Sequence, residues 1–346
     1  MAIIASSIRS VTRRLFSSTE SLNKLLTPIN IDELKWYSES DIPPEIPLID
    51  LQSMSQQEKN SSFKQAFETA RCVYIKNHLI SNKVSEDLVN ITRKLLNQSE
   101  EVKSKIVHPY KGIMRGYKGY GKEKSAQVFD HAKTNEADSH VSFCWGPADN
   151  VYPDLTFQKL WQRYYKKSLK ISKEIAELAI KNAGIEDVID WNNLKAGDHL
   201  LKLQEYVALG DKPHQPQRLG PHVDFDFLTI INQLPAENGY IGLQVSMNEK
   251  IINLPAVKGT IVILFGEAMQ SISKGKVKGP IHNVISPQEN KYEGSSRTSI
   301  LFFLQPHPKT KVSRTEGSHL SEYYGEKETI RYGDFHSRLL GEFYKD

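Results

Sequence analysis

The chain has 346 residues, of which 39% are hydrophobic and 25% charged, and its formal net charge is +4. This composition is typical of a soluble globular protein, and the scattered Lys and Arg residues argue against a nucleic-acid partner. No run of 18 apolar residues occurs, so we expect no membrane span. Cys72 and Cys144 form neither a disulfide framework nor a C-x-x-C site, which fits a reducing compartment.

The N-terminal segment differs in composition from the rest of the chain. Residues 1–16 are rich in arginine and serine, contain no acidic residue, and place apolar residues at helical spacing. These features are typical of an amphipathic transit peptide, and Arg14-Leu15-Phe16 resembles a mitochondrial processing site. We therefore expect mitochondrial import. The alternative is a disordered tail on a cytoplasmic protein. Residues 17–45 are expected to form a linker with a short helix near residues 31–37.

Residues 46–190 are predicted to form strands and long helices. The prolines of residues 42–47 favour an extended stretch there, and residues 72–78 are rich in β-forming side chains. Residues 84–98 have helical apolar periodicity, with Ser85 as the expected N-cap. The longest helical pattern covers residues 157–182 and is expected to end near Gly184. We expect its aromatic residues to face the core.

From residue 195 to residue 310, short β-rich runs follow one another between Gly, Pro, Asn and Lys clusters. The runs are residues 199–209, 226–234, 241–247, 249–254, 259–266 and 298–306. Such a series suggests a closed or double-layered antiparallel β structure. The predicted fold class is therefore α+β, with a helical first half that supports a β second half. Residues 311–346 are expected to form a polar C-terminal extension, helical at best.

The segment PHVDFDFLTI, residues 221–230, places His222 and Asp224 on one face of a predicted strand. His282 lies in a later β-rich apolar segment, GPIHNVI. Two histidines and one carboxylate can form the facial triad of a non-haem iron(II) oxygenase. Taken alone, H-x-D could end a surface strand, and His282 could be a core residue. Their combination favours a metal site.

The segment RTSILFF places Arg297 and Ser299 on the same face at the start of an apolar strand. An arginine buried there without a protein carboxylate would require an anion, and its forked guanidinium suits a carboxylate. The alternative is an edge strand with a surface arginine.

Together, H-x-D, a distant His and R-x-S resemble the isopenicillin N synthase-like (plant-type) class of iron- and 2-oxoglutarate-dependent oxygenases. The segments PLIDL, RCVYIKNHLI, LKLQEYV, GLQV and ISKGKVKGPIHNV also resemble that family, so the resemblance spans residues 46–310. It implies a double-stranded β-helix (jelly-roll) domain over residues 195–310, preceded by an N-terminal dioxygenase region over residues 46–190.

The resemblance also implies the cofactors and the residues that bind them. Fe²⁺ would be bound by His222, Asp224 and His282. 2-Oxoglutarate would be bound by Arg297 and Ser299, with contributions from Tyr206 and Gln204. With O₂, the enzyme would hydroxylate or desaturate a small organic molecule and release succinate and CO₂.

The sequence departs from the family pattern at several positions. Asn283 follows the distal histidine where the family commonly has Arg, and Glu267 stands where Asp is usual. Gln204 occupies a position usually held by Asn. Asp226 could compete with Asp224 as the acidic ligand, but the family spacing favours Asp224. These departures leave the subfamily open.

The substrate site is expected at the mouth of the barrel. The segments MRGYKGYG and SHVSFCWG offer Arg115, Tyr117 and Phe143, and Arg115 would suit an acidic small molecule. The alternative is a flexible surface loop. We expect a monomer.

Rival interpretations of the whole chain are a cupin-like zinc or manganese enzyme, an ascorbate-using oxidase of the same family, and a catalytically inactive binding protein.

Overall fold

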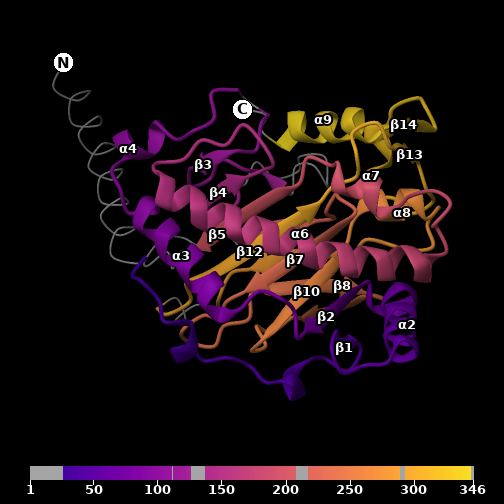
Figure 1. Cartoon of the computed structure of the whole chain (residues 1–346), viewed down its shortest axis with the longest axis horizontal. Coiled ribbons are helices and arrows are strands. Elements are labelled where there is room, and N and C mark those ends of the chain that lie inside the picture. Colours follow the sequence, from indigo (N-terminus) through magenta and orange to yellow (C-terminus); the bar gives the residue numbers. More distant parts are fainter. Residues whose placement is uncertain (1–25, 111, 126–136, 208–216, 289–292, 344–346) are drawn as a thin grey trace.

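The computed structural model describes residues 26–110, 112–125, 137–207, 217–288 and 293–343 (Figure 1). The transit peptide predicted over residues 1–16 lies outside the described residues. Among those that are described, no helix combines the length and the apolar character needed to cross a membrane.

The described part of the predicted linker, residues 26–45, packs on the fold instead of forming a free tether. Leu26 and Ile31 are buried, and Tyr37 forms a backbone bridge with Val257. The predicted short helix is only the 3-10 turn η1 (Ile31–Glu33), and a second turn, η2 (Glu39–Asp41), follows it. The buried side chains explain the difference, because each one anchors the segment to the core.

The N-terminal region confirms the predicted strand and both long helices. Its helix α3 begins at Asn82 with Ser81 as N-cap, so the prediction of Ser85 as N-cap is wrong. Helix α6 ends at Ala183 with Gly184 (φ 63°) as its C-cap, as expected. The elements are β1 (Leu48–Asp50), α2 (Gln56–Gln65), η3 (Ala66–Ala70), β2 (Cys72–Lys76), α3 (Asn82–Leu96), α4 (Glu100–Ser104), β3 (Gly116–Lys118), β4 (Val141–Trp145), α6 (Leu155–Ala183) and α7 (Trp191–Lys195).

The β-rich half follows the predicted runs closely. Its elements are β5 (Leu200–Tyr206), β6 (Gln217–His222), β7 (Leu228–Gln233), β8 (Leu243–Met247), β9 (Lys250–Asn253), β10 (Thr260–Phe265), α8 (Glu267–Ile272), β11 (Ile281–Ile285) and β12 (Arg297–Leu304).

Within the described residues, two sheets form the jelly-roll core. The larger sheet has the order β1-β2-β10-β7-β12-β5-β4-β3, and the smaller has the order β6-β11-β8-β9. Strands β2 and β4 pair with β10 and β5, so the N-terminal region contributes strands to the larger sheet. The long helix α6 lies across this sheet, with α3 beside it (Figure 1).

The aromatic residues of α6 face the core, as predicted. The rings of Phe157 and Trp161 lie 4.7 Å and 4.8 Å from the ring of Phe143 on β4, between centroids. All three side chains are buried. This packing fixes α6 against the sheet that carries the pocket residues described below.

The predicted polar C-terminal extension is a packed part of the fold, and it contains strands as well as a helix. The strands β13 (Lys311–Ser313) and β14 (Thr329–Arg331) pair with each other, and η4 (Ser321–Tyr324) and α9 (Tyr332–Phe343) complete the segment. Tyr332, Phe335, Leu339 and Phe343 of α9 are buried. Their helical spacing supplies an apolar face, which explains why this segment docks on the core.

Candidate functional site

The pocket is built on the inner faces of two neighbouring strands. Successive side chains on a strand point to opposite faces, so every second residue of β5 and β12 faces inward. The antiparallel register pairs Arg297 with Tyr206 and Ser299 with Gln204. The same register pairs Leu301 with Lys202 and Phe303 with Leu200, and all eight side chains line the pocket.

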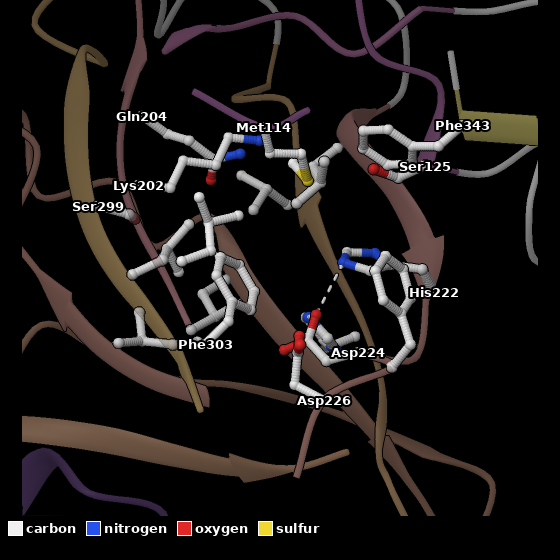
Figure 2. A pocket seen from close by; sticks show the side chains of 18 of the residues that line it. Met114, Ser125, Lys202, Gln204, His222, Asp224, Asp226, Ser299, Phe303 and Phe343 are labelled. Atoms are coloured by element: carbon white, nitrogen blue, oxygen red, sulfur yellow. Dashed lines mark ion pairs between the residues drawn. The ribbon is translucent and has the colours of Figure 1, made fainter. Parts of the chain in front are cut away.

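Three side chains converge at one place in this pocket. His222, at the end of β6, pairs directly with His282 on β11, and Asp224 follows β6. One Asp224 carboxylate oxygen lies 3.6 Å from Nε2 of each histidine. The three potential ligand atoms lie within 4.8 Å of one another. Figure 2 shows the His222–Asp224 contact as a dashed line.

Neighbouring groups fix the orientation of these side chains. Nδ1 of His222 lies 2.8 Å from the Gly220 carbonyl oxygen, and Nδ1 of His282 lies 3.2 Å from that of Pro280. A carbonyl oxygen only accepts, so each Nδ1 carries a proton, and Nε2 is the atom that each neutral ring would offer to a metal. The Thr229 hydroxyl donates to the second Asp224 oxygen at 2.5 Å.

The pKa shifts at the site arise from burial and from these three side chains. Burial alone would lower the pKa of His222, but Asp224 raises it. Burial alone would raise the pKa of Asp224, but His282 and His222 lower it to about 2. Burial, together with His222, lowers the pKa of His282 to about 4. A carboxylate and neutral imidazole nitrogen are ligands that iron(II) accepts, so the donor set fits this metal.

Arg297 is the second feature of the site. It is buried, and its Nη2 donates to Gln233 Oε1 and Ser299 Oγ, each at 3.0 Å. Its Nη1 is buried with no hydrogen-bond partner among the described residues, and none of their carboxylates pairs with it. A buried, incompletely paired guanidinium is costly unless an anion accompanies it. The residues present therefore fit a carboxylate ligand.

Tyr206 and Gln204 complete this end of the pocket. The Tyr206 ring centre lies 5.1 Å from the Arg297 guanidinium carbon. The Tyr206 hydroxyl donates to Gln204 Oε1 at 2.9 Å, and Gln204 Nε2 lies 3.2 Å from His140 Nε2. Tyr206 thus lies beside Arg297 and Gln204 beside Ser299, and their predicted contact with 2-oxoglutarate stays a prediction.

The structure does not bring the three predicted substrate residues into the pocket lining. Arg115 is buried and forms an ion pair with Asp198 at 2.5 Å. Tyr117 packs under Lys103, whose Nζ lies 5.3 Å from the Tyr117 ring centre, and Phe143 belongs to the aromatic core. Of the two predicted segments, residues 114–121 and 139–146, the described residue that lines this pocket is Met114.

Several lining residues were missed by the sequence analysis. They are Ser125, Lys202, Gln305, His336 and Phe343. Every second residue of a strand faces the same side. Counting back from Gln204 would therefore have found Lys202, and counting on from Ser299 would have found Gln305. The apolar spacing of residues 332–343 would have indicated α9, but no sequence signal places its residues over the pocket.

Two family models match the chain. The 2OG-Fe(II) oxygenase superfamily model matches residues 198–306, and the model of the N-terminal region of non-haem dioxygenases in morphine synthesis matches residues 46–162. Together they cover both the pocket-bearing domain and the region that precedes it.

Curated relatives agree with these matches. Deacetoxycephalosporin C synthase of Amycolatopsis lactamdurans is 27% identical over 273 residues, which cover 76% of this chain and 84% of the relative. An alpha-ketoglutarate dependent kainoid synthase of Digenea simplex is 26% identical over 330 residues, which cover 89% of this chain and 87% of the relative.

Solved structures share the fold. A full-length Neurospora crassa protein, determined in complex with alpha-KG, has a TM-score of 0.68 at 23% identity, and the match covers 89% of this chain and 98% of that protein. The rice dioxygenase for auxin oxidation has a TM-score of 0.63 at 17% identity, with coverages of 84% and 93%.

The chain therefore belongs to the 2OG-Fe(II) oxygenase superfamily. It is an oxidoreductase whose reaction depends on Fe²⁺, 2-oxoglutarate and O₂.

Proposed function

We propose that His222, Asp224 and His282 bind the iron of this oxygenase, and that Arg297 and Ser299 bind the distal carboxylate of 2-oxoglutarate. One observation carries the proposal: three potential ligand atoms within 4.8 Å of one another share a pocket with a buried arginine whose Nη1 has no hydrogen-bond partner among the described residues. The substrate is proposed to be a small organic molecule whose C–H bond is hydroxylated or desaturated, with release of succinate and CO₂.

When bound, iron(II) and 2-oxoglutarate together supply the activation of O₂ and the oxidation of a C–H bond. The protein positions the reactants. The Nδ1 hydrogen bonds of His222 and His282 hold both rings with Nε2 toward Asp224. Arg297 fixes one end of 2-oxoglutarate by charge and by hydrogen bonds, and the Gln233 amide oxygen holds the guanidinium in place.

The remaining lining restricts water and leaves room for an organic substrate. Apolar side chains from both sheets surround the three ligand positions: Leu219, Ile231, Leu243, Val284, Leu301 and Phe303. Such a lining favours a substrate with an apolar body and keeps bulk water from the reacting atoms.

The test is anaerobic addition of Fe²⁺ and 2-oxoglutarate to the purified protein. A weak visible charge-transfer absorption is expected in the wild type and in His108→Ala, whose histidine lies outside the pocket lining. It should be absent in His222→Ala. A wild type that binds Fe²⁺ but gives no absorption at saturating 2-oxoglutarate contradicts the residue assignment. Succinate release coupled to substrate oxidation separates this function from an ascorbate-using oxidase and from a non-redox metal enzyme.

We further propose a monomeric enzyme that is imported into mitochondria. The support is the composition of residues 1–16, which are rich in Arg and Ser and lack acidic residues. Fusion of a fluorescent protein to the full chain and to a chain without residues 1–16 tests import, and cytosolic fluorescence of the full fusion would contradict it. Light scattering of the purified protein tests the oligomeric state.

A further inference from the structure

At the end of the pocket away from Arg297, three polar residues form a group that the proposed iron and 2-oxoglutarate contacts do not use. Asp226 comes from the segment after β6, Gln305 directly follows β12, and His336 is on α9. All three line the pocket. We call this group the distal polar cluster. In Figure 2, Asp226 lies beside Asp224, away from the labelled Gln204 and Ser299.

Hydrogen bonds hold the cluster together. The Tyr332 hydroxyl donates to Asp226 Oδ1 at 3.1 Å, and the Gln305 side chain lies close enough to Asp226 to lower its pKa. Gln305 Nε2 lies 3.3 Å from His336 Nε2. An amide nitrogen only donates, so His336 Nε2 accepts, and its Nδ1 carries the proton. Burial lowers the pKa of His336 to about 4, which keeps the ring neutral near pH 7.

His336 lines the pocket, and no hydrogen bond from its Nδ1 to a described residue occurs, so we infer that this N–H can donate to a ligand. The cluster thus offers the ring N–H of His336 and the carboxyl group of Asp226, with the side-chain amide of Gln305 between them. A ligand group that both donates and accepts hydrogen bonds would satisfy it. Unpaired polar groups facing a largely apolar pocket are costly, so a ligand without such a group would bind less well.

This end of the pocket offers an anion no free counter-charge among the described residues. Asp226 is the acid of the cluster; burial and the neighbouring Asp224 raise its pKa to about 8, and no described cation is paired with it. Arg115, the cation that acts on His336 electrostatically, is already held by Asp198 and by the carbonyl oxygens of Ala148 and Met114. A ligand carboxylate would therefore be buried beside Asp226 without a counter-charge, which is costly.

The strand register gives the spacing between the two polar ends of the pocket. Arg297 and Gln305 are both inward-facing and eight residues apart, which corresponds to roughly 26 Å along an extended strand. Between these two ends, the pocket is lined by the apolar side chains of Leu301, Phe303 and Leu200. Lys202 also lies there, but its ammonium group forms an ion pair with Glu123 at 2.5 Å. An apolar body suits this middle part.

We propose that the distal polar cluster binds the end group of the substrate, and that this group is a carboxamide, an amine or a similar hydrogen-bond donor, not a carboxylate. The substrate would then have an apolar body and a non-anionic polar end held by His336, Gln305 and Asp226. This inference rests on the proposed function, because the body must pass the three iron-binding side chains.

The test uses three probes that share one apolar body: 3-phenylpropanamide, 3-phenylpropylamine and 3-phenylpropanoate. Calorimetric titration of the full chain, loaded with redox-inactive Mn²⁺ and saturating 2-oxoglutarate, measures their affinities without turnover. We expect the amide or the amine to bind at least about tenfold more tightly than the carboxylate, the order of one hydrogen bond to a charged group. Equal or tighter binding of the carboxylate overturns the proposal. So does failure of all three probes to bind.

Two variants and one control assign the discrimination to the cluster. His336→Phe and Gln305→Leu keep similar side-chain volumes and remove the hydrogen-bonding groups, so the preference should fall to about twofold or less. Leu301→Val, in the apolar middle, should weaken all three probes alike and keep the preference. An unchanged preference in both cluster variants overturns the proposal.

Binding of 2-oxoglutarate to each variant serves as the check on folding. Loss of Mn²⁺ and 2-oxoglutarate binding in the wild type would instead contradict the proposed function. The two failures are thereby distinguishable.

Discussion

Glu123 and Lys202 form an ion pair at 2.5 Å, and both side chains are buried. The same Glu123 oxygen lies 2.7 Å from Nε2 of His140, which contacts Gln204. Close polar contacts therefore run from Lys202 through Glu123, His140 and Gln204 to Tyr206, beside Arg297. The segment that carries Glu123 is thereby tied to the proposed 2-oxoglutarate end of the pocket.

Removal of the Glu123 charge is expected to destabilise the fold strongly. Glu123→Gln leaves the Lys202 ammonium buried without a counter-charge, which costs about 3–5 kcal/mol of unfolding free energy. The double variant Glu123→Leu/Lys202→Met removes both charges and should recover at least half of that loss. Urea unfolding measures both values. A Glu123→Gln variant that is as stable as the wild type would contradict the ion pair between Glu123 and Lys202.

The same pair predicts a specific pH dependence. Burial would raise the pKa of Glu123, but Lys202 and His140 hold it well below its ordinary 4.5. A depressed acid pKa contributes stability that is present above the unfolded-state pKa and is lost as the pH falls below it. The stability difference between wild type and Glu123→Gln should therefore be constant from pH 6 to 8 and shrink below about pH 4.5. A difference that grows on acidification would contradict this sign.

Arg297 is expected to set the affinity for 2-oxoglutarate. Arg297→Met removes a charge-assisted contact worth about 1.5–3 kcal/mol, so the Kd for 2-oxoglutarate of the Mn²⁺-loaded protein should rise roughly 10- to 150-fold. Ser299→Ala removes a neutral hydrogen bond and should raise it by about tenfold or less. Calorimetric titration measures both, and Mn²⁺ affinity is the control. Unchanged 2-oxoglutarate binding in Arg297→Met would exclude this role.

Asp224, not Asp226, is expected to bind the metal. A single Asp224 oxygen contacts both histidines, whereas Asp226 is engaged by Tyr332 and Gln305. Asp224→Asn should reduce Mn²⁺ affinity by more than about 100-fold, and Asp226→Asn by less than about tenfold, the lower range for a residue behind a ligand. Electron paramagnetic resonance of free Mn²⁺ gives both values. A larger loss of Mn²⁺ affinity in Asp226→Asn than in Asp224→Asn would make Asp226 the metal ligand.

The sequence predicted the parts of the site that lie on or directly after short regular strands. Alternation on β12 placed Arg297 and Ser299. The spacing of two brought His222 and Asp224 together, although strand β6 ends at His222 and Asp224 lies in the segment after it. Arg115 was misplaced because its partner Asp198 is 83 positions away, and no local pattern reveals that pairing. His336 was missed for the same reason: helical periodicity finds α9, but only tertiary packing brings it to the pocket.

A glycine contact behind the metal site gives the last prediction. A Cβ at Gly266 would lie 2.1 Å from the Asp226 carbonyl oxygen and 3.0 Å from that of Asp224. The Glu267 backbone N–H also donates to the Asp224 carbonyl oxygen at 2.7 Å, so this backbone cannot retreat without losing that bond. Gly266→Ala should therefore displace the Asp224–Asp226 segment.

We expect Gly266→Ala to cost about 1–3 kcal/mol of unfolding free energy, the usual cost of overpacking, and to weaken Mn²⁺ binding as well. The control is Gly341→Ala on α9, where a Cβ meets nothing within 4 Å. Because alanine has the higher helix propensity, that variant should be neutral or slightly more stable. Urea unfolding and Mn²⁺ titration of both variants decide the matter. A Gly266→Ala protein with wild-type stability and metal affinity would show that the Asp224–Asp226 segment is not held by this contact.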